Sequence, residues 1–127
     1  MSVVFDDFLQ SAENLLNNPD SKEIDFRNLM SRSYYALFHL SKEISKNLPV
    51  PVGKFRRQGS HEKVIFIFEN NIDVSVKQLG LMITLLKKSR CKADYHIHEN
   101  IMQSEAKQHL LAVKGTIKKL EQLKENP

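Results

Sequence analysis

The stretch Ala106–Leu120, AKQHLLAVKGTIKKL, decides the fold of this chain. Its apolar residues recur at alternating steps of four and three, which is the spacing of one apolar stripe along an α-helix. The residues of the stripe are Ala106, Leu110, Val113, Ile117 and Leu120. Such a stripe is typical of helices that pack side by side in a bundle. We therefore expect a final helix that begins near Gln103 or Ser104, with its lysines facing water.

Two segments near the N-terminus have the same helical spacing of apolar residues. The first covers residues 4–16 and stops at the turn-forming residues Asn17–Asp20. Asp20 and Glu23 resemble the capping box that starts a helix. The second helix is expected to run from there to Pro49, which cannot continue it.

Two further helices are expected between the proline-rich segment 49–59 and the final helix. Ser60 is a suitable cap for the first, although its apolar run Val64–Phe68 also fits a buried strand. The second extends from Ile72 to about Lys92, after which the apolar period is lost. Residues 1–127 are therefore predicted to form a single all-α domain, an up-and-down bundle of about five helices.

The composition is that of a small globular protein. The chain has 127 residues, 41% of them hydrophobic, so it is long enough for one core and too short for two ordinary domains. Cys91 is the only cysteine, which excludes an intrachain disulfide. The N-terminus lacks the features of a signal peptide, and no apolar run reaches the roughly 18 residues of a membrane span. We expect a cytoplasmic protein without a membrane segment.

Charge is distributed unevenly along the chain, whose net charge is +4. Residues 1–25 carry six acidic side chains and one basic one, and residues 26–127 carry nine acidic and eighteen basic ones. A basic body favours binding to a polyanion such as RNA, because phosphate contacts release counterions and steer association. Solvated helix surface is the alternative explanation of the same charges.

The segment Arg90–His96, RCKADYH, is the strongest candidate for chemistry. Arginine is a permanent cation whose fork matches phosphate oxygens, and histidine exchanges protons near neutral pH. RNA cleavage without a metal uses both abilities, since the phosphorane charge must be stabilised and the leaving oxygen protonated. We predict that Arg90 and His96 are catalytic without a cofactor, and that Lys92, Asp94 and Tyr95 position them.

The geometry of a helix restricts how Arg90 and His96 can meet. Six residues apart on a straight helix, they point about 120° apart, since each residue turns by about 100°. They converge where the helix ends or bends between them, and a symmetric homodimer would place one histidine on each side of a phosphate. The alternative is that Arg90 forms a surface ion pair with Asp94 and that His96 is a loop residue.

Other basic residues are candidate RNA contacts. Arg56, Arg57 and His61 lie on and after the proline-rich segment, which we expect to be a mobile loop. Lys87 and Lys88 immediately precede the Arg90 segment. Plain solvent exposure is the alternative for all five.

The remaining histidines have less specific surroundings. His39 lies seven residues after Arg32 and hence on the same helix face, and His109 on the final helix is expected to be structural. His96 and His98 with their neighbouring carboxylates lack the spacing of a metal-binding motif, so we predict no metal site. The expected core residues beside His39 are Tyr34, Leu37 and Phe38.

Three short blocks of this sequence resemble, in order and spacing, the HEPN family of prokaryotes. They are residues 34–39 (YYALFH), 59–64 (GSHEKV) and 90–95 (RCKADY). In that family a Tyr-Tyr-Ala-x-Phe run on a long helix, a Ser-His or Thr-His helix start and an Arg-x-x-Ala-Asp-Tyr run before the final helix recur. The resemblance covers about residues 5–120 and implies an all-helical bundle that dimerises.

The resemblance also implies an activity. Many members are metal-independent endoribonucleases of toxin–antitoxin pairs or antiviral systems, and their arginine and histidine have the spacing of Arg90 and His96. A nucleotidyltransferase-like antitoxin commonly restrains them. Members without the histidine are non-catalytic, so the alternative is a HEPN module that binds RNA, a nucleotide or a partner protein. A third possibility is a small subunit of a larger helical assembly, docked through its acidic first helix.

Overall fold

The computed structural model describes residues 4–51 and 59–125. Within these ranges the chain forms five α-helices and no strand. The helices are α1 (Phe5–Asn17), α2 (Glu23–Ser45), α3 (Ser60–Glu69), α4 (Val74–Tyr95) and α5 (Gln103–Glu125). The prediction of an all-α bundle is therefore confirmed. Most of the loop that we expected to be mobile, including Arg56 and Arg57, lies outside the described residues.

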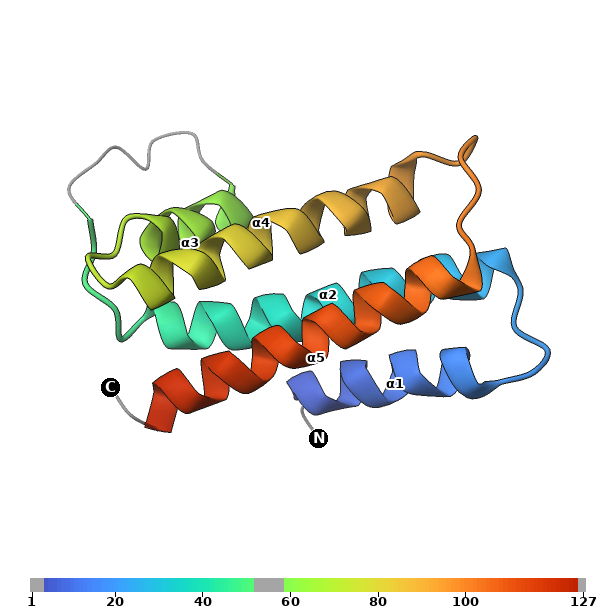
Figure 1. Cartoon of the computed structure of the whole chain (residues 1–127), viewed down its shortest axis with the longest axis horizontal. Helices are drawn as coiled ribbons and strands as arrows, with labels where there is room; N and C mark the ends of the chain where they lie inside the picture. Colours follow the sequence, from blue (N-terminus) through green and yellow to red (C-terminus); the bar gives the residue numbers. More distant parts are fainter. Residues whose placement is uncertain (1–3, 52–58, 126–127) are drawn as a thin grey trace.

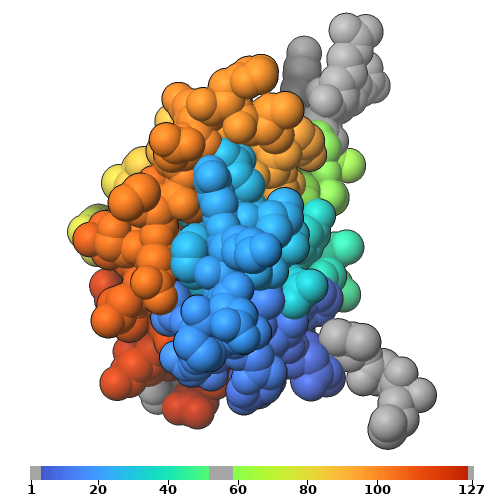
Figure 2. Space-filling view, turned by 90° about the vertical axis from the view of Figure 1, so that its right-hand side faces the viewer, coloured from blue at the N-terminus to red at the C-terminus, as the bar shows by residue number. Residues whose placement is uncertain are grey.

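Helix α2 is the centre of the bundle, since it contacts each of the other four helices. Figure 1 shows α1, α2, α4 and α5 along the long axis with alternating direction, which is the up-and-down arrangement. The short α3 packs against α4 and against α2. The α1–α2 and α4–α5 connections lie next to each other at one end of the bundle, which faces the viewer in Figure 2.

The core consists of two sets of apolar side chains, and α2 contributes to both. The larger set contains the aromatic face of α2, where Tyr34, Leu37 and Phe38 are buried as predicted. The stripe of α5 is buried along its whole length, because its first two residues join the smaller set and its last three the larger. Among the described residues no helix is long and apolar enough to cross a membrane.

The start of α2 differs from the prediction. The helix begins at Glu23, and its first turn is closed by Asp25, whose carboxylate accepts the Lys22 N–H at 2.8 Å. The predicted Asp20 and Glu23 capping box is wrong. The Asp20 N–H is instead held by the side-chain oxygen of Asn18 at 2.9 Å, within the turn that precedes the helix.

Helix α3 packs closely on α4. Ser60 is the first residue of α3 and Gly59 holds the cap position, so the predicted cap role of Ser60 and the alternative of a strand are both wrong. A Cβ atom on Gly80 of α4 would lie 2.9 Å from the backbone nitrogen of Glu69 and 3.0 Å from the Cβ of Phe68. Glycine at this position therefore allows the two helices their close approach.

Helix α4 extends beyond its predicted end. It begins at Val74 rather than Ile72 and ends at Tyr95, three residues after Lys92. The last turn carries the buried Ala93, which packs in the smaller core set. Tertiary contacts at this end, rather than the apolar period of the sequence, therefore determine where α4 stops.

Candidate functional site

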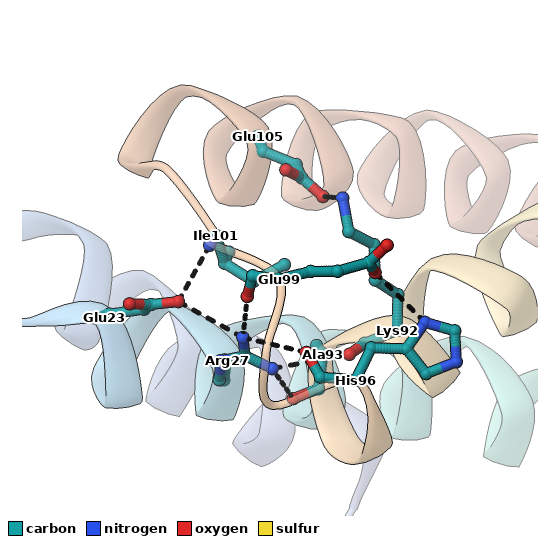
Figure 3. A network of polar contacts seen from close by, with 8 residues as sticks. All are labelled: Glu23, Arg27, Lys92, Ala93, His96, Glu99, Ile101 and Glu105. Carbon is teal, nitrogen blue, oxygen red and sulfur yellow. Dashed lines mark hydrogen bonds and ion pairs between the residues drawn. The ribbon is translucent and has the colours of Figure 1, made fainter.

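Arg27 holds together the end of α4 and the connection to α5 (Figure 3). Its side chain leaves the first turns of α2 and is only 8% exposed. Nη1 donates to the carbonyl oxygen of Ala93 at 2.9 Å, and Nη2 donates to the carbonyl oxygens of His96, at 3.2 Å, and of Glu99. The last carbonyl groups of a helix have no hydrogen-bond partner within the helix. Here the Arg27 guanidinium donates a hydrogen bond to one of them, that of Ala93.

Glu23 completes the Arg27 network. One carboxylate oxygen lies 3.2 Å from Arg27 Nη2 and also accepts the N–H of Ile101 at 2.9 Å. The hydrogen bond from Ile101, followed by that from Arg27, lowers the pKa of Glu23. Sequence reasoning missed this network, because Glu23 and Arg27 resemble an ordinary surface pair four residues apart. The available signal was that Arg27 shares a helix face with the buried Met30 and Tyr34.

Arg90 points into the bundle toward α2. It is 7% exposed, and its guanidinium carbon lies 5.2 Å from the centre of the Tyr34 ring and 5.8 Å from that of Tyr35. At these distances the face of an aromatic ring attracts a cation. Nη1 donates to Asp94 Oδ2 at 3.2 Å. The alternative Arg90–Asp94 ion pair is therefore present, but partly buried and not on the surface.

The guanidinium of Arg90 keeps unused hydrogen-bonding capacity. Its Nε is buried and has no hydrogen-bond partner among the described residues. Burial by itself lowers the pKa of Arg90, but the Asp94 carboxylate together with Cys91 and Tyr35 outweighs this and leaves the pKa above its usual value. Buried donors in folded proteins are nearly always paired. Arg90 is thus a charged group with a donor that the described fold does not satisfy.

Arg90 and His96 are not brought together within one chain. His96 follows the last residue of α4, with its side chain 58% exposed and Nδ1 3.1 Å from Glu99 Oε2. It lines a groove between α3 and α4, whereas Arg90 faces the aromatic rings of α2. Because α4 stays helical through Tyr95, the two side chains do not converge. A site with both residues from one chain is therefore not formed in the described structure.

The predicted supporting residues separate in a similar way. Asp94 faces Arg90. Lys92 instead forms an ion pair with Glu105 of α5 at 3.0 Å, and Tyr95 is exposed. In the part of the chain that the structure describes, Asp94 is the one residue of these three that contacts Arg90.

His61 lies within electrostatic range of Arg90, and the Tyr34 side chain contacts both. The Tyr34 hydroxyl is 2.9 Å from His61 Nδ1, and the His61 ring stacks on Phe38 with ring centres 3.9 Å apart. Burial, followed by the nearby Arg90 and Lys87, lowers the pKa of His61. We call Tyr34, Tyr35, Phe38, His61 and Arg90 the Arg90 cluster. Each of the three sequence blocks contributes to it, although no local spacing in the sequence indicated that they would meet.

The groove between α3 and α4 has a volume of about 590 Å³. Two predicted RNA contacts, Lys87 and Lys88, line it together with His96. Lys87 forms an ion pair with Glu62 across the groove, and Lys88 is exposed. The remaining lining residues are Ile65, Phe66, Glu69, Thr84 and Cys91. The groove is thus apolar in its interior and carries charges of both signs.

His39 and His109 pack against neighbouring helices. His39 stacks on Phe8 of α1 with ring centres 5.4 Å apart, and Arg32 reaches Ser11 of the same helix at 2.7 Å. His109 is buried, and its Nε2 lies 3.0 Å from the Met30 carbonyl oxygen, as expected for a structural residue. Residues 4–51 and 59–125 contain no group of three or more His, Cys, Asp or Glu side chains that could hold a metal ion.

Comparisons with protein-family models, with curated proteins and with solved structures found no match to this chain. The fold and the Arg90 cluster are therefore the observations from which a function can be argued. The cluster offers a desolvated cation, a neutral imidazole and exposed aromatic surface at Tyr35. These groups suit a phosphate-bearing ligand.

Proposed function

We propose that this protein is a HEPN-type endoribonuclease that cleaves RNA without a metal ion, at a composite site of Arg90 and His96 in a homodimer. The observation that carries the proposal is the guanidinium of Arg90, a largely buried cation that lies against the rings of Tyr34 and Tyr35 and has one ion pair among the described residues, to Asp94. Phosphate oxygens match the planar donor fork of an arginine. A cation in a water-poor site also stabilises the charge of a phosphorane more strongly than a cation in water.

The second copy is required because the two side chains do not converge in one chain. His96 is exposed at the end of α4, where an imidazole of a neighbouring copy would be available as a general acid or base. Lys87 and Lys88 line the same groove as His96 and would attract the RNA backbone. Each site of the dimer would then combine Arg90 of one copy with His96 of the other.

The biological role that we propose follows from the resemblance of the three sequence blocks. All three contribute to one cluster, through Tyr34, His61 and Arg90. This convergence supports a common role for the blocks. The proposed role is the toxin of a toxin–antitoxin or antiviral defence system, with a nucleotidyltransferase-like antitoxin or another defence protein as its partner.

A second candidate function is a non-catalytic HEPN module that binds RNA, a nucleotide or a partner protein. One observation favours it: Asp94 lies 3.2 Å from Arg90, and the rings of Tyr34 and Tyr35 lie against the guanidinium. A phosphate must therefore bind beside the carboxylate or displace it. Such a module needs the fold and Arg90 but does not need His96.

Cleavage of end-labelled RNA in excess EDTA tests the proposal. The proteins to compare are the wild type, Arg90→Ala, His96→Ala and, as a matched control, His98→Ala, which changes an exposed imidazole two residues away. We expect the wild type and His98→Ala to cut RNA and to leave 2′,3′-cyclic phosphate ends. Loss of one positioned donor typically slows such a reaction by about 100-fold or more, so Arg90→Ala is expected to be nearly silent.

The outcome for His96 separates the two functions. If RNA is cut and His96→Ala is inactive while folded and dimeric, the composite site stands. Mixing inactive Arg90→Ala with inactive His96→Ala should then restore part of the activity, because one site of the mixed dimer has both residues. If none of the proteins cuts RNA but the wild type binds it, the non-catalytic module replaces the nuclease.

A further inference from the structure

We propose that His61 and Arg90 of the same chain form a phosphate-binding subsite, in which His61 donates a hydrogen bond from Nε2 to a phosphate oxygen held by Arg90. The ligand class is the phosphodiester group of RNA. This inference rests on the proposed function and adds a residue of α3 to it. The subsite lies within one chain, whereas the composite site needs His96 of a second copy.

Tyr34 determines which nitrogen of His61 carries the proton. Its side chain is fully buried, and burial raises its pKa, so the hydroxyl keeps its proton. A buried O–H group must donate a hydrogen bond, and His61 Nδ1 lies 2.9 Å from it. Nδ1 is therefore the acceptor, and the neutral ring carries its proton on Nε2.

The charge state of His61 suits an anion site that already holds a cation. Burial, and then Arg90 and Lys87, hold the pKa of His61 below its ordinary value, with a smaller contribution from His39 and an opposing one from Glu62. The ring is thus neutral at pH 7. It adds an N–H donor beside Arg90 without a second charge that the guanidinium would repel.

The Nε2 donor of His61 is unused and its position is fixed. Among the described residues this nitrogen has no hydrogen-bond partner, and the ring is only partly buried. Stacking on Phe38 and the hydrogen bond to Tyr34 hold its plane. Arg90 is held by Asp94 and by the face of the same Tyr34 ring. Two donors whose positions are fixed, one from α3 and one from α4, therefore lie around one tyrosine, and a phosphate oxygen that bridges them would be held as in an oxyanion site.

Nuclear magnetic resonance of the imidazole nitrogens at pH 7, with cytidine 3′-monophosphate as the probe, tests the subsite. In the wild type we expect the His61 spectrum of a ring protonated on Nε2, and a shift of this signal on addition of the nucleotide. Tyr34→Phe removes the hydroxyl donor and should give a mixture of the two ring forms. His61→Leu should weaken nucleotide binding by about tenfold, the loss of one charge-assisted hydrogen bond, while the control His98→Leu should bind as the wild type does.

The results distinguish this inference from the proposed function. If the His61 signal does not shift when the nucleotide is added, and His61→Leu binds the nucleotide as the wild type does, the subsite is overturned even if the wild type cuts RNA. A perturbed His61 signal and weaker binding by His61→Leu support the subsite even if no protein cuts RNA, in which case the nuclease fails alone. If His61→Leu does not fold, the wild-type titration and Tyr34→Phe decide the question.

Discussion

Arg27 and Arg90 are almost equally buried, at 8% and 7% exposure, yet their donors are used very differently. Arg27 donates to several backbone carbonyl oxygens at the end of α4 and to the Glu23 carboxylate. Arg90 donates to Asp94, and its Nε has no partner among the described residues. Both side chains connect α2 with the last turns of α4.

The difference separates an arginine that holds the fold from one that is poised to bind. A guanidinium has five N–H donors, and both terminal nitrogens of Arg27 are occupied by backbone carbonyl oxygens and the Glu23 carboxylate. In Arg90 the one ion pair among the described residues is with the Asp94 side chain, and the buried Nε without a partner costs stability. We therefore expect the fold to depend on Arg27 and the function to depend on Arg90.

Replacement of Arg27 by methionine is expected to have the largest effect on stability. The change keeps much of the apolar stem but removes the guanidinium donors at the end of α4, and it takes the Arg27 donor away from the buried Ala93 carbonyl oxygen. The free energy of unfolding should fall by about 3–5 kcal/mol. Urea denaturation followed by circular dichroism measures it. A loss of less than about 1 kcal/mol, typical of a surface pair, would contradict the expectation that the fold depends on Arg27.

Both His109 and Glu23 of the Arg27 network have a lowered pKa, so each can reduce the free energy of unfolding in acid. The contribution of His109 must therefore be measured separately. Burial lowers the pKa of His109 to about 4, while the hydrogen bond to the Met30 carbonyl, followed by the charge of Glu105, acts in the opposite direction. Because the pKa is lower in the folded chain than the ordinary 6.5, the stabilisation is complete above pH 6.5 and is lost as pH falls from 6.5 toward 4. The total is about 3 kcal/mol.

His109→Gln tests this assignment. The glutamine amide retains a donor for the Met30 carbonyl but does not titrate. Urea denaturation of the wild type and the variant at a series of pH values should show a gap in acid sensitivity that opens below pH 6.5. Identical slopes for the two proteins would mean that other groups, such as Glu23, cause the acid loss.

Gly80→Ala is expected to disturb the Arg90 cluster while leaving the Arg27 network intact. The added methyl group would meet the backbone of Glu69 and push α3, with His61, away from α4. Overpacking of this kind costs about 1–3 kcal/mol. RNA cleavage should fall in parallel. The matched control is Gly115→Ala in α5, where a Cβ meets no described atom within 4 Å and the helix should gain about 0.5–1 kcal/mol.

Arg90→Met is expected to have the smallest effect on stability and to abolish RNA cleavage. The change loses the Asp94 ion pair and the contact with two tyrosine rings, but it also removes an unpaired donor. The net loss should be about 1–2 kcal/mol. Thermal unfolding and RNA cleavage measured on the same preparation check both parts. A destabilisation as large as that of Arg27→Met would make Arg90 a structural residue and erase the contrast.

Much of the fold was predictable because helical periodicity is a local property. The stripe of α5, the aromatic face of α2 and the number of helices all follow from residues three and four positions apart. The errors fall at helix ends. The capping box at Asp20 and the end of α4 at Lys92 were wrong, because these ends depend on a turn at Asn18 and on Arg27 from another helix.

The candidate site was predictable only in part. Arg90 was singled out from its own segment, as was its pairing with Asp94 four residues later. His61 was assigned to an RNA surface and not to Arg90, because nothing in a local spacing connects positions 29 residues apart. Arg27 was not singled out, since its backbone acceptors lie 65 and more residues away.

By itself, the sequence determined that this protein is a helical bundle and which side chains form its core, since burial of apolar stripes is specified by each helix separately. Only the tertiary structure decided how the polar side chains are paired. It pairs Arg27 with carbonyl groups at the end of α4 and in the connection to α5, directs His96 away from Arg90, and places His61 and Arg90 around Tyr34. Polar partners are chosen by the packing of helices against one another, which no local pattern of residues encodes.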